Sequence, residues 1–465
     1  MDILVSLFSV TVLFLIFLIW KRFEDLKERD SYILDYQCYK PTDDRKLSTK
    51  QCGEIIRRNK NLGLLEYKFL LKAVVSSGIG EETYGPRIMF EGREEKPSVK
   101  DGILEMEAFS YDCIDKVFGR TGIQPSEIDV LVVNVSMLAS IPSLTSYIIN
   151  RYKLREDIRS FNLTGMGCSA SLISVDVARN ILKTYKNVNA LVLTSECLST
   201  NWYNGKDKSM ILANCLFRSG GCAILMTNKR SLRDRAMFKL KCLQRIHHAG
   251  YDDSYGCCIE KEDEEGRPGF YLSRSLPKVA TRAFVDNLKL ITPKILPAWE
   301  LVRYGILTLV HNMRHGSGKG AEDAKPMINF RTGVDHFCIH TGGKAVIDGI
   351  GNSLRLNEYE LEPARMTLHR FGNTSASSLW YVLSYLEAKK RLKKGHKVLM
   401  FSFGAGFQCH SCLWEVMRDL PAIGNVWEEC IDRYPHNNQL SPFMQKFAWI
   451  NEQDDPDNFV IMEEL

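Results

Sequence analysis

Between Phe161 and Asn180 the sequence changes from the pattern of a strand to that of a helix. Two glycines follow an apolar run that ends at Leu163, and apolar residues recur at helical spacing from Leu172. Cys168 lies on the predicted turn between strand and helix. Exposed N–H groups and the helix dipole stabilise anions at such a position, so we expect a thiolate and a nucleophilic role there. The structural alternative is a small buried cysteine.

The same alternation of strand and helix patterns recurs along the 465 residues. It predicts an α/β layered fold built from two similar halves, although no exact sequence repeat supports a duplication. A glycine-rich polar stretch, Arg314 to Asp323, marks the boundary between the halves. Beyond Leu420 the periodicity is lost, which predicts a peripheral tail. Strands are expected at 128–136, 190–196, 222–227, 237–242, 336–340 and 397–403. One helix is expected at 103–118, a second is expected to begin at 344, and a third is expected to end at 389.

The N-terminus has the composition of a membrane anchor. Ile3 to Trp20 contains no charged residue and is followed by Lys21 and Arg22, which is typical of a span with an interfacial, cytosolic edge. A cleaved signal peptide fits less well, because a basic leading region and a small-residue cleavage site are both absent. The fourteen cysteines form no compact disulfide framework, which favours reduced thiols in the cytosol. We therefore expect a transmembrane anchor over residues 1–20.

A second apolar stretch runs from Ile291 to Val310 but contains Glu300 and Arg303. A helix that lies on a membrane surface or lines an apolar site is therefore a better interpretation of this stretch than a second transmembrane span. The net charge of +5 is spread along the chain, and no stripe of Lys and Arg with interleaved aromatics indicates nucleic-acid binding.

Several of the ten histidines lie at strand ends or beside glycines. His340 ends an apolar strand before two glycines, and His336 lies on the same face four residues earlier. His369 precedes an Arg-Phe-Gly sequence, and His247 follows a strand. Asn373, which precedes a predicted helix, has an alternative reading as a helix cap.

Metal binding is not favoured. His336 and His340 could form a pair of ligands, but no carboxylate or cysteine completes a zinc-type spacing. Cys409 and Cys412 form a single C-x-x-C on a predicted strand, where core packing is the simpler account.

A cysteine nucleophile followed by His and Asn suits two chemistries. Papain-like proteolysis has this chain order, but its local cysteine signature is missing and a cytosolic membrane protein is the wrong setting. In decarboxylative Claisen condensation, the cysteine accepts an acyl group from a thioester. Neutral His and Asn donors then stabilise the enolate that forms when a malonyl thioester loses carbon dioxide. That reaction needs no metal or redox cofactor.

Five strings of this sequence resemble those of plant 3-ketoacyl-CoA synthases, the membrane-bound condensing enzymes of very-long-chain fatty acid elongation, which belong to the thiolase-like superfamily. The resemblance extends from Tyr32 to Leu420. It implies a thiolase-like layered αβαβα fold with internal duplication, here preceded by one transmembrane helix where many members have two. The strings are Asn162 to Ala170, Asn201 to Tyr203, Phe217 to Gly221, His336 to Asp348 and Met366 to Ser375.

By this resemblance Cys168 is the acyl-accepting nucleophile, and His340 and Asn373 bind the malonyl thioester carbonyl and promote decarboxylation. The segment Gly404 to Gly406 resembles the superfamily's glycine loop near the oxyanion site. Three further histidines match residues treated as essential in the family: His247, His336 and His369.

The implied organisation is an anchor (1–20), an N-terminal condensing module with Cys168 (31–313), a C-terminal module with His340 and Asn373 (326–420) and a tail (421–465). The implied reaction extends a long-chain acyl-CoA by two carbons with malonyl-CoA, releasing carbon dioxide and CoA, without a cofactor. Ile291 to Val310 would help the acyl tail enter from the bilayer.

The resemblance also implies partners and a location. We expect a homodimer, elongase reductases and a dehydratase as partners, and the endoplasmic reticulum membrane with the body facing the cytosol. Two alternatives stay open: an enzyme similar to type III polyketide synthases, and a catalytically silent partner of the elongase complex.

Overall fold

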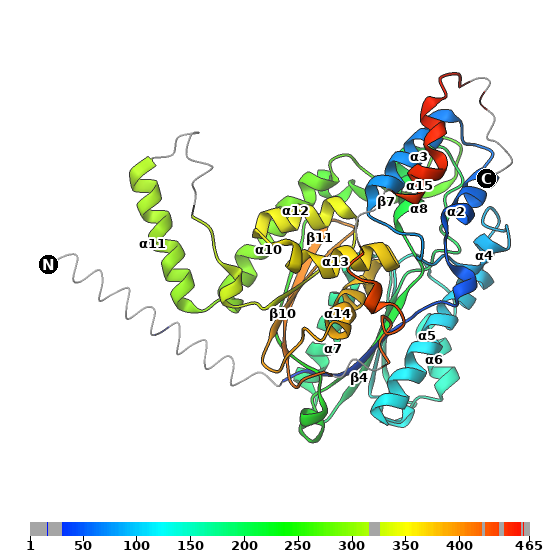
Figure 1. The fold of residues 1–465 in the computed structure, drawn as a ribbon. Helices are drawn as coiled ribbons and strands as arrows, with labels where there is room; N and C mark the ends of the chain where they lie inside the picture. Colours follow the sequence, from blue (N-terminus) through cyan, green and yellow to red (C-terminus); the bar gives the residue numbers. More distant parts are fainter. Residues whose placement is uncertain are drawn as a thin grey trace.

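The computed structural model describes residues 16, 30–315, 326–420, 424–436, 441–456 and 459. A mixed sheet of nine strands forms the centre of this part of the chain (Figure 1), in the order β3-β2-β4-β5-β1-β6-β11-β10-β9, and β7 and β8 form a separate hairpin. In chain order the strands are β1 (Tyr32–Cys38), β2 (Val130–Val135), β3 (Arg159–Leu163), β4 (Asn189–Ser195), β5 (Gly221–Thr227), β6 (Phe238–His247), β7 (Cys258–Glu262), β8 (Pro268–Leu272), β9 (His336–Ile339), β10 (Lys397–Gly404) and β11 (Gln408–Val416).

Helices cover both faces of the sheet (Figure 1). They are α2 (Thr49–Arg58), α3 (Leu64–Ser77), α4 (Arg87–Phe90), α5 (Val99–Thr121), α6 (Leu144–Tyr152), α7 (Ala170–Thr184), α8 (Lys208–Leu216), α9 (Asp252–Tyr255), α10 (Leu276–Ile295), α11 (Ala298–His315), α12 (Lys344–Leu354), α13 (Glu358–Phe371), α14 (Ser378–Ala388) and α15 (Pro442–Phe447).

The two halves of the sheet repeat one pattern of strand pairing. In the first half β2 pairs in parallel with β4, and β4 and β1 pair antiparallel with β5. In the second half β9 pairs in parallel with β10, and β10 and β6 pair antiparallel with β11. Pairing of β1 with β6 joins the halves. The predicted mixed α/β fold is confirmed, and this pairing agrees with an internal duplication.

Two helices lie between the halves. α7 packs against β2 and β4 of the first half and against β6 and β11 of the second, and α14 packs against β1 as well as β9 and β10. Strand β2 shows why the sequence produces layers: Val130 and Val132 face the core that contains α7 and α14, whereas Leu131 and Val133 face α5. Successive side chains point to opposite faces of a strand, so a strand buried on both faces is apolar at most of its positions.

The apolar stretch predicted at 291–310 is divided between two helices. α10 ends at Ile295, and Leu296 adopts an extended conformation with ψ 150°, as the residue before a proline is constrained to do. α11 then extends away from the sheet (Figure 1). Within the described ranges, no helix is both long enough and apolar enough to cross a membrane. The predicted anchor over residues 1–20 lies outside them except for Ile16, as does most of the predicted boundary loop.

The prediction of a peripheral tail after Leu420 was wrong for the described part of that segment. Trp427 is fully buried in the main core, where its Nε1 donates to the carbonyl of Tyr381 at 3.1 Å. Phe443 and Phe447 of α15 are buried in a cluster with residues of α3 and α8. Trp427 packs as a single side chain and produces no period. Phe443 and Phe447 are four residues apart, which is the spacing of one helix face, so this short pattern was a signal for a buried helix.

Candidate active site

The turn that carries Cys168 is held between two strands. After β3 the backbone of Gly167 has φ +65°, which favours glycine, and a Cβ on it would lie 2.7 Å from the backbone nitrogen of Ala405. The predicted glycine loop, Gly404 to Gly406, therefore packs directly on the turn. The hydroxyl of Ser402 on β10 donates to the carbonyl of Cys168 at 2.9 Å. Cys168 itself lies in a 3₁₀ turn, Gly167–Ser169, immediately before α7.

Cys168 is half-buried, and its Sγ lies 3.5 Å from Ser375 Oγ. Burial raises its pKa to about 12, and hydrogen bonds from Ser375 and Asn373 offset only part of that effect. This direction is opposite to the effect expected of a helix N-terminus, which favours the thiolate. Attack by the thiol form on a thioester requires a group that takes its proton.

Glu196 is the carboxyl group that is linked to this thiol. It follows β4 and is buried, and its Oε1 accepts a hydrogen bond from the backbone N–H of Met137 at 2.8 Å. Ser375 Oγ lies 3.1 Å from Glu196 Oε2 and 3.5 Å from Cys168 Sγ. Burial raises the pKa of Glu196 to about 7. A single hydroxyl thus joins the thiol to a carboxyl group that titrates near neutral pH.

Asn373 is fixed through its backbone and its side chain. Its backbone N–H donates to the carbonyl of Leu216 at 3.1 Å, and its carbonyl accepts from the N–H of Arg218 at 2.9 Å. Its Oδ1 accepts from the backbone N–H of Ser375 at 2.9 Å, which leaves Nδ2 as the donor that can act on Cys168. Asn373 does not cap α14, because Ser377 occupies the N-cap position of that helix.

His340 lies at the end of β9 and is joined to the same segment. Its Nδ1 is 2.6 Å from Oγ of Ser378, the first residue of α14, which comes one turn after Ser375. Burial lowers the pKa of His340 to about 4, so the imidazole is neutral near pH 7. The segment from Asn373 to Ser378 therefore connects His340, the amide of Asn373 and the Cys168 thiol.

Two family models together match most of this chain. Residues 23–313 match the family model described as FAE1/Type III polyketide synthase-like protein, and residues 331–416 match that of the 3-oxoacyl-[acyl-carrier-protein] synthase III C-terminal domain. The chain is 64% identical to 3-ketoacyl-CoA synthase 12 of Arabidopsis thaliana, over 99% of each chain. It is 63% identical to 3-ketoacyl-CoA synthase 3 of the same plant, over 100% of this chain and 99% of the relative.

The chain belongs to the 3-ketoacyl-CoA synthase family. The resemblance seen in the sequence is thereby confirmed.

Solved structures share the fold, among them a type III polyketide synthase. The 1,3,6,8-tetrahydroxynaphthalene synthase of Streptomyces coelicolor superposes with a TM-score of 0.62 at 16% identity, over 83% of this chain and 99% of that one. CsyB complexed with CoA-SH also gives a TM-score of 0.62, at 15% identity, over 83% of this chain and all of that one. At such identities the likeness concerns the fold alone, and it supports the thiolase-like architecture.

Two of the other three predicted histidines lie on β6 and β9. His247 ends β6, and its Cε1 lies 3.2 Å from the position of a Cβ on Gly406, so it contacts the glycine loop behind Cys168. His336 begins β9, and its Nε2 lies 3.0 Å from Nδ1 of His396. His340 comes four positions after His336 along an extended segment, which corresponds to about 13 Å at the usual rise per residue.

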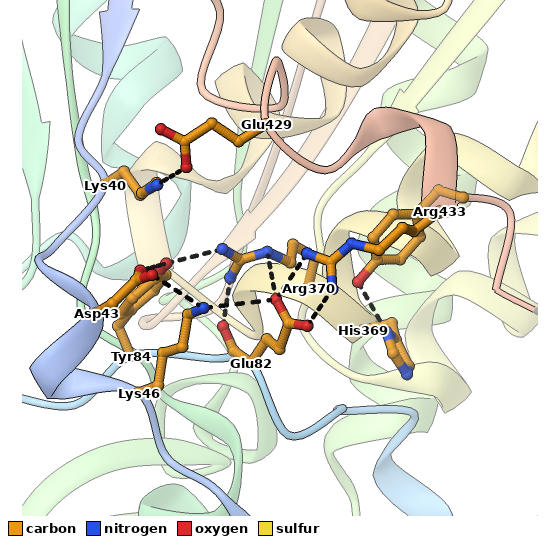
Figure 2. A network of polar contacts seen from close by, with 10 residues as sticks. Lys40, Asp43, Lys46, Glu82, Tyr84, His369, Arg370, Glu429 and Arg433 are labelled. Carbon is orange, nitrogen blue, oxygen red and sulfur yellow. Dashed lines mark hydrogen bonds and ion pairs between the residues drawn. The ribbon is translucent and has the colours of Figure 1, made fainter.

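His369 belongs to a polar network that joins α13 to the C-terminal segment (Figure 2). Its Nδ1 lies 3.2 Å from the hydroxyl of Tyr434, and its ring stacks on that of His436 at 4.5 Å between centroids. The neighbouring Arg370 bonds the hydroxyl of Tyr84 at 2.7 Å and lies beside Glu82. No contact of His336 or His369 reaches Cys168 within the described chain. Their catalytic roles stay predictions, and their contacts are those of positioning residues.

Glu196, Ser375 and Ser378 are site residues that were not predicted from the sequence. One signal for Glu196 was available: a carboxyl group directly follows the apolar strand β4, at the carboxyl end where parallel sheets bind ligands. The two serines had no such signal, because their importance depends on contacts with Cys168, 207 residues away from Ser375, and with His340. No cluster of three or more potential metal ligands occurs in the described ranges.

Proposed function

We propose that this chain condenses a long-chain acyl-CoA with malonyl-CoA through an acyl-Cys168 intermediate. The products are a 3-ketoacyl-CoA two carbons longer, carbon dioxide and CoA, as needed in very-long-chain fatty acid elongation. The observation that carries the proposal is the meeting of Cys168 with Ser375, Glu196 and the Asn373 amide. The 3-ketoacyl-CoA synthases of Arabidopsis supply the reaction class.

In the first half-reaction the sulfur of Cys168 attacks the acyl-CoA carbonyl. The S–C bond to the acyl group forms and the bond to the CoA sulfur breaks. The thiol proton passes to the Ser375 oxygen while the Ser375 proton passes to the Glu196 carboxylate. The proton now held by Glu196 then protonates the departing CoA thiolate. A carboxyl group with a pKa near 7 suits this exchange, because general catalysis is most effective when the pKa is close to the working pH.

In the second half-reaction the Asn373 amide and the neutral His340 donate hydrogen bonds to the malonyl thioester oxygen. The C–C bond to the malonyl carboxylate breaks and carbon dioxide leaves. The electron pair of that bond stays on the thioester part as an enolate, which these donors stabilise. The enolate carbon attacks the acyl-Cys168 carbonyl, a C–C bond forms and the C–S bond breaks. The Cys168 thiolate regains a proton from solvent through Glu196 and Ser375.

The covalent intermediate gives the test. Full-length protein in lipid nanodiscs is incubated with a long-chain acyl-CoA without malonyl-CoA and digested for mass spectrometry. We expect the acyl group on the Cys168 peptide, its loss in Cys168→Ala, and its retention in Cys113→Ala, which alters a buried cysteine of α5. Acyl transfer to another residue, or none, contradicts the proposal. In a second incubation that includes malonyl-CoA, repeatedly extended products would favour the polyketide-synthase alternative. Absence of both acylation and extension would favour the silent partner.

The proposal places the protein at the endoplasmic reticulum membrane with its body in the cytosol. The apolar run Ile3 to Trp20 with its basic flank supports this, and so does α11. Five apolar side chains of α11, each between 48% and 78% exposed, form one stripe at alternating spacings of three and four residues. Such a stripe is typical of a helix that lies in a membrane interface. The members of the stripe are Trp299, Val302, Ile306, Leu309 and Met313.

A photoreactive amino acid tests the membrane contact of α11. Benzoylphenylalanine is placed at Ile306 on α11 or, as a control, at Tyr359 on α13. Both side chains are 57% exposed. In microsomes with labelled phospholipid, we expect lipid adducts at 306 and few at 359. Adducts of position 306 to protein instead of lipid would overturn the membrane contact.

A homodimer, and an assembly with the elongase reductases and dehydratase, complete the proposal on the strength of the family resemblance. Light scattering of the detergent-solubilised protein should give the mass of two chains. Copurification from microsomes should recover the partner enzymes. A monomer in light scattering would contradict the homodimer. Copurification of none of these enzymes would contradict the assembly.

A further inference from the structure

Two loops that are far apart in the sequence meet at one end of the sheet. The first leads into β6 and includes its start (229–241), and the second connects α14 to β10 (390–397). The end of β11 and the residues after it (415–419) run between these loops. Val416 pairs with Phe238 of β6, and its N–H donates to the carbonyl of His396 at 2.9 Å. We call the surface of these three segments the basic face.

The basic face carries most of the positive charge of the protein. Its three segments contain twelve basic and three acidic side chains, whereas the whole chain has a net charge of +5. Two of the acids already have partners: Glu415 pairs with Lys241 at 3.3 Å, and Asp419 accepts from the N–H of Lys394 at 2.9 Å. Six of the cations form no ion pair with any residue that the structure describes, and all of them except the first are exposed. They are Lys229, Arg230, Arg233, Lys390, Lys393 and Lys394.

The chain enters the folded body beside the basic face. β1 and β6 pair through their first residues, and Asp30, just before β1, forms an ion pair with Lys239 at 2.7 Å. The apolar run Ile3 to Trp20 ends ten residues before Asp30, and ten residues of chain span at most about 35 Å. A membrane that holds this run therefore lies within reach of the basic face.

The start of α11 lies at the same end of the sheet. α10 ends against Gly333, where the carbonyl of the last helical residue leaves no room for a Cβ. Two residues later, the N–H of Asp335 donates to the carbonyl of Lys397 in the basic face at 2.9 Å. β10 begins at Lys397 and ends at Gly404 beside the Cys168 turn, about 23 Å away at the usual rise per residue. The candidate active site therefore lies at the other end of β10.

We propose that the basic face docks on anionic phospholipid headgroups of the membrane that holds the N-terminal run. This inference rests on the proposed membrane location and is independent of the condensation. Basic side chains beside a membrane span are attracted to anionic lipids, and each strengthens the binding roughly fivefold. Docking holds the Cys168 turn away from the headgroups, on the side from which water-soluble malonyl-CoA approaches. Salt should weaken the contact, because the screening length falls from about 8 Å at physiological ionic strength to about 3 Å at 1 M.

Lysine labelling tests the contact on the full-length wild-type chain. The protein is placed in nanodiscs of phosphatidylcholine, either alone or mixed with phosphatidylglycerol, and treated with an amine-acetylating reagent. Mass spectrometry then gives the rate at each lysine. We expect Lys390, Lys393 and Lys394 to react at least threefold more slowly in the anionic discs, and 1 M salt to remove the difference. Lys96 and Lys100 should react equally in both discs.

The two control lysines are exposed and lie far from the basic face. α5 ends at Thr121, whose carbonyl accepts from Arg235 of the basic face, and Lys100 lies about 32 Å away along that helix. Equal rates in the two kinds of disc at all five lysines would overturn the docking alone. Protein that does not elute with the discs would reject the membrane location and the docking with it, whatever the result for condensation.

A matched pair of double variants separates the basic face from the N-terminal run. Arg230→Gln with Arg233→Gln removes two exposed cations of the first loop, and Lys96→Gln with Lys100→Gln removes the same charge at the far end of α5. We expect the first variant to lose at least half of the protection of Lys393 and Lys394 in anionic discs, and the second to keep it. Protection that survives in both variants would mean that the N-terminal run alone brings these lysines to the lipid, which would overturn the proposal. Melting temperatures identify a variant that fails to fold.

Discussion

Ser375 Oγ lies 3.5 Å from Cys168 Sγ, and the same oxygen lies 3.1 Å from Glu196 Oε2. A hydroxyl carries one proton and can donate to only one of these neighbours at a time. When it donates to the Glu196 carboxylate, its lone pairs face the thiol and can accept the thiol proton. Through this contact the proton of the Cys168 thiol can reach the Glu196 carboxylate. Three of the following predictions concern the residues of this site.

The first prediction concerns pH. Glu196 can accept a proton only as a carboxylate, and its pKa is about 7, so the rate of Cys168 acylation should rise as the pH increases through about 7. Glu196→Gln should remove this inflection and lower the rate at pH 8 by roughly 10²- to 10⁴-fold, the usual range for general catalysis. The rate is measured by quenched mass spectrometry of the Cys168 peptide.

Glu387 provides the control for the pH experiment. It is also buried with a pKa of about 7, but it bonds the hydroxyl of Tyr36. Glu387→Gln should keep the inflection near pH 7. If Glu196→Gln keeps it as well, the base is another group.

The second prediction separates the Ser375 hydroxyl from its backbone. Ser375 has φ +53°, a left-handed conformation that costs a residue with a Cβ about 1–2 kcal/mol. Ser375→Ala and Ser375→Gly should both slow acylation of Cys168 by roughly tenfold or more, in line with loss of general catalysis. Ser375→Gly should also be the more stable of the two, as its melting temperature would show. Full acylation activity in the glycine variant would exclude the hydroxyl from proton transfer.

The third prediction separates the two half-reactions. Asn373→Asp keeps the oxygen that accepts from the Ser375 N–H but replaces the amide donor. Loss of one donor to a developing oxyanion costs roughly 10²- to 10³-fold. We expect decarboxylation of labelled malonyl-CoA to fall by that factor, with acylation of Cys168 reduced much less. An equal fall in both steps would place the amide in acylation as well.

The fourth prediction concerns the C-terminal segment. Trp427 is fully buried among aromatic residues, so Trp427→Ala should destabilise the protein by about 3–5 kcal/mol. Trp299→Ala removes the same side chain from an exposed position on α11 and should change stability by no more than about 0.5 kcal/mol. Melting temperatures of the two purified variants compare them. A Trp427→Ala protein as stable as the wild type would mean that this segment is not part of the core.

Much of the fold could be predicted from the sequence because its strands are buried on both faces. β2 and β4 each contain four consecutive apolar residues, and the glycines around Cys168 mark the turn before α7. The C-terminal segment could not be predicted, since Trp427 contributes to the core as a single side chain without a period.

The site was predicted in its residue types but not in its electrostatics. The resemblance implied Cys168, His340 and Asn373, and the structure connects all three through the segment from Asn373 to Ser378. The pKa of the thiol depends on burial by distant segments, which local sequence does not reveal. For the same reason the roles of Glu196 and Ser375, which come from different halves of the chain, could not be predicted.

The most direct test of the account uses microsomes from yeast that express the wild-type chain or Cys168→Ala. Each preparation receives labelled malonyl-CoA and a series of acyl-CoAs, and 3-ketoacyl products are separated by length. We predict products two carbons longer than the substrate from the wild type, and none above background from Cys168→Ala. No product from folded wild-type protein across the whole series, or equal product from the variant, would contradict condensation at Cys168.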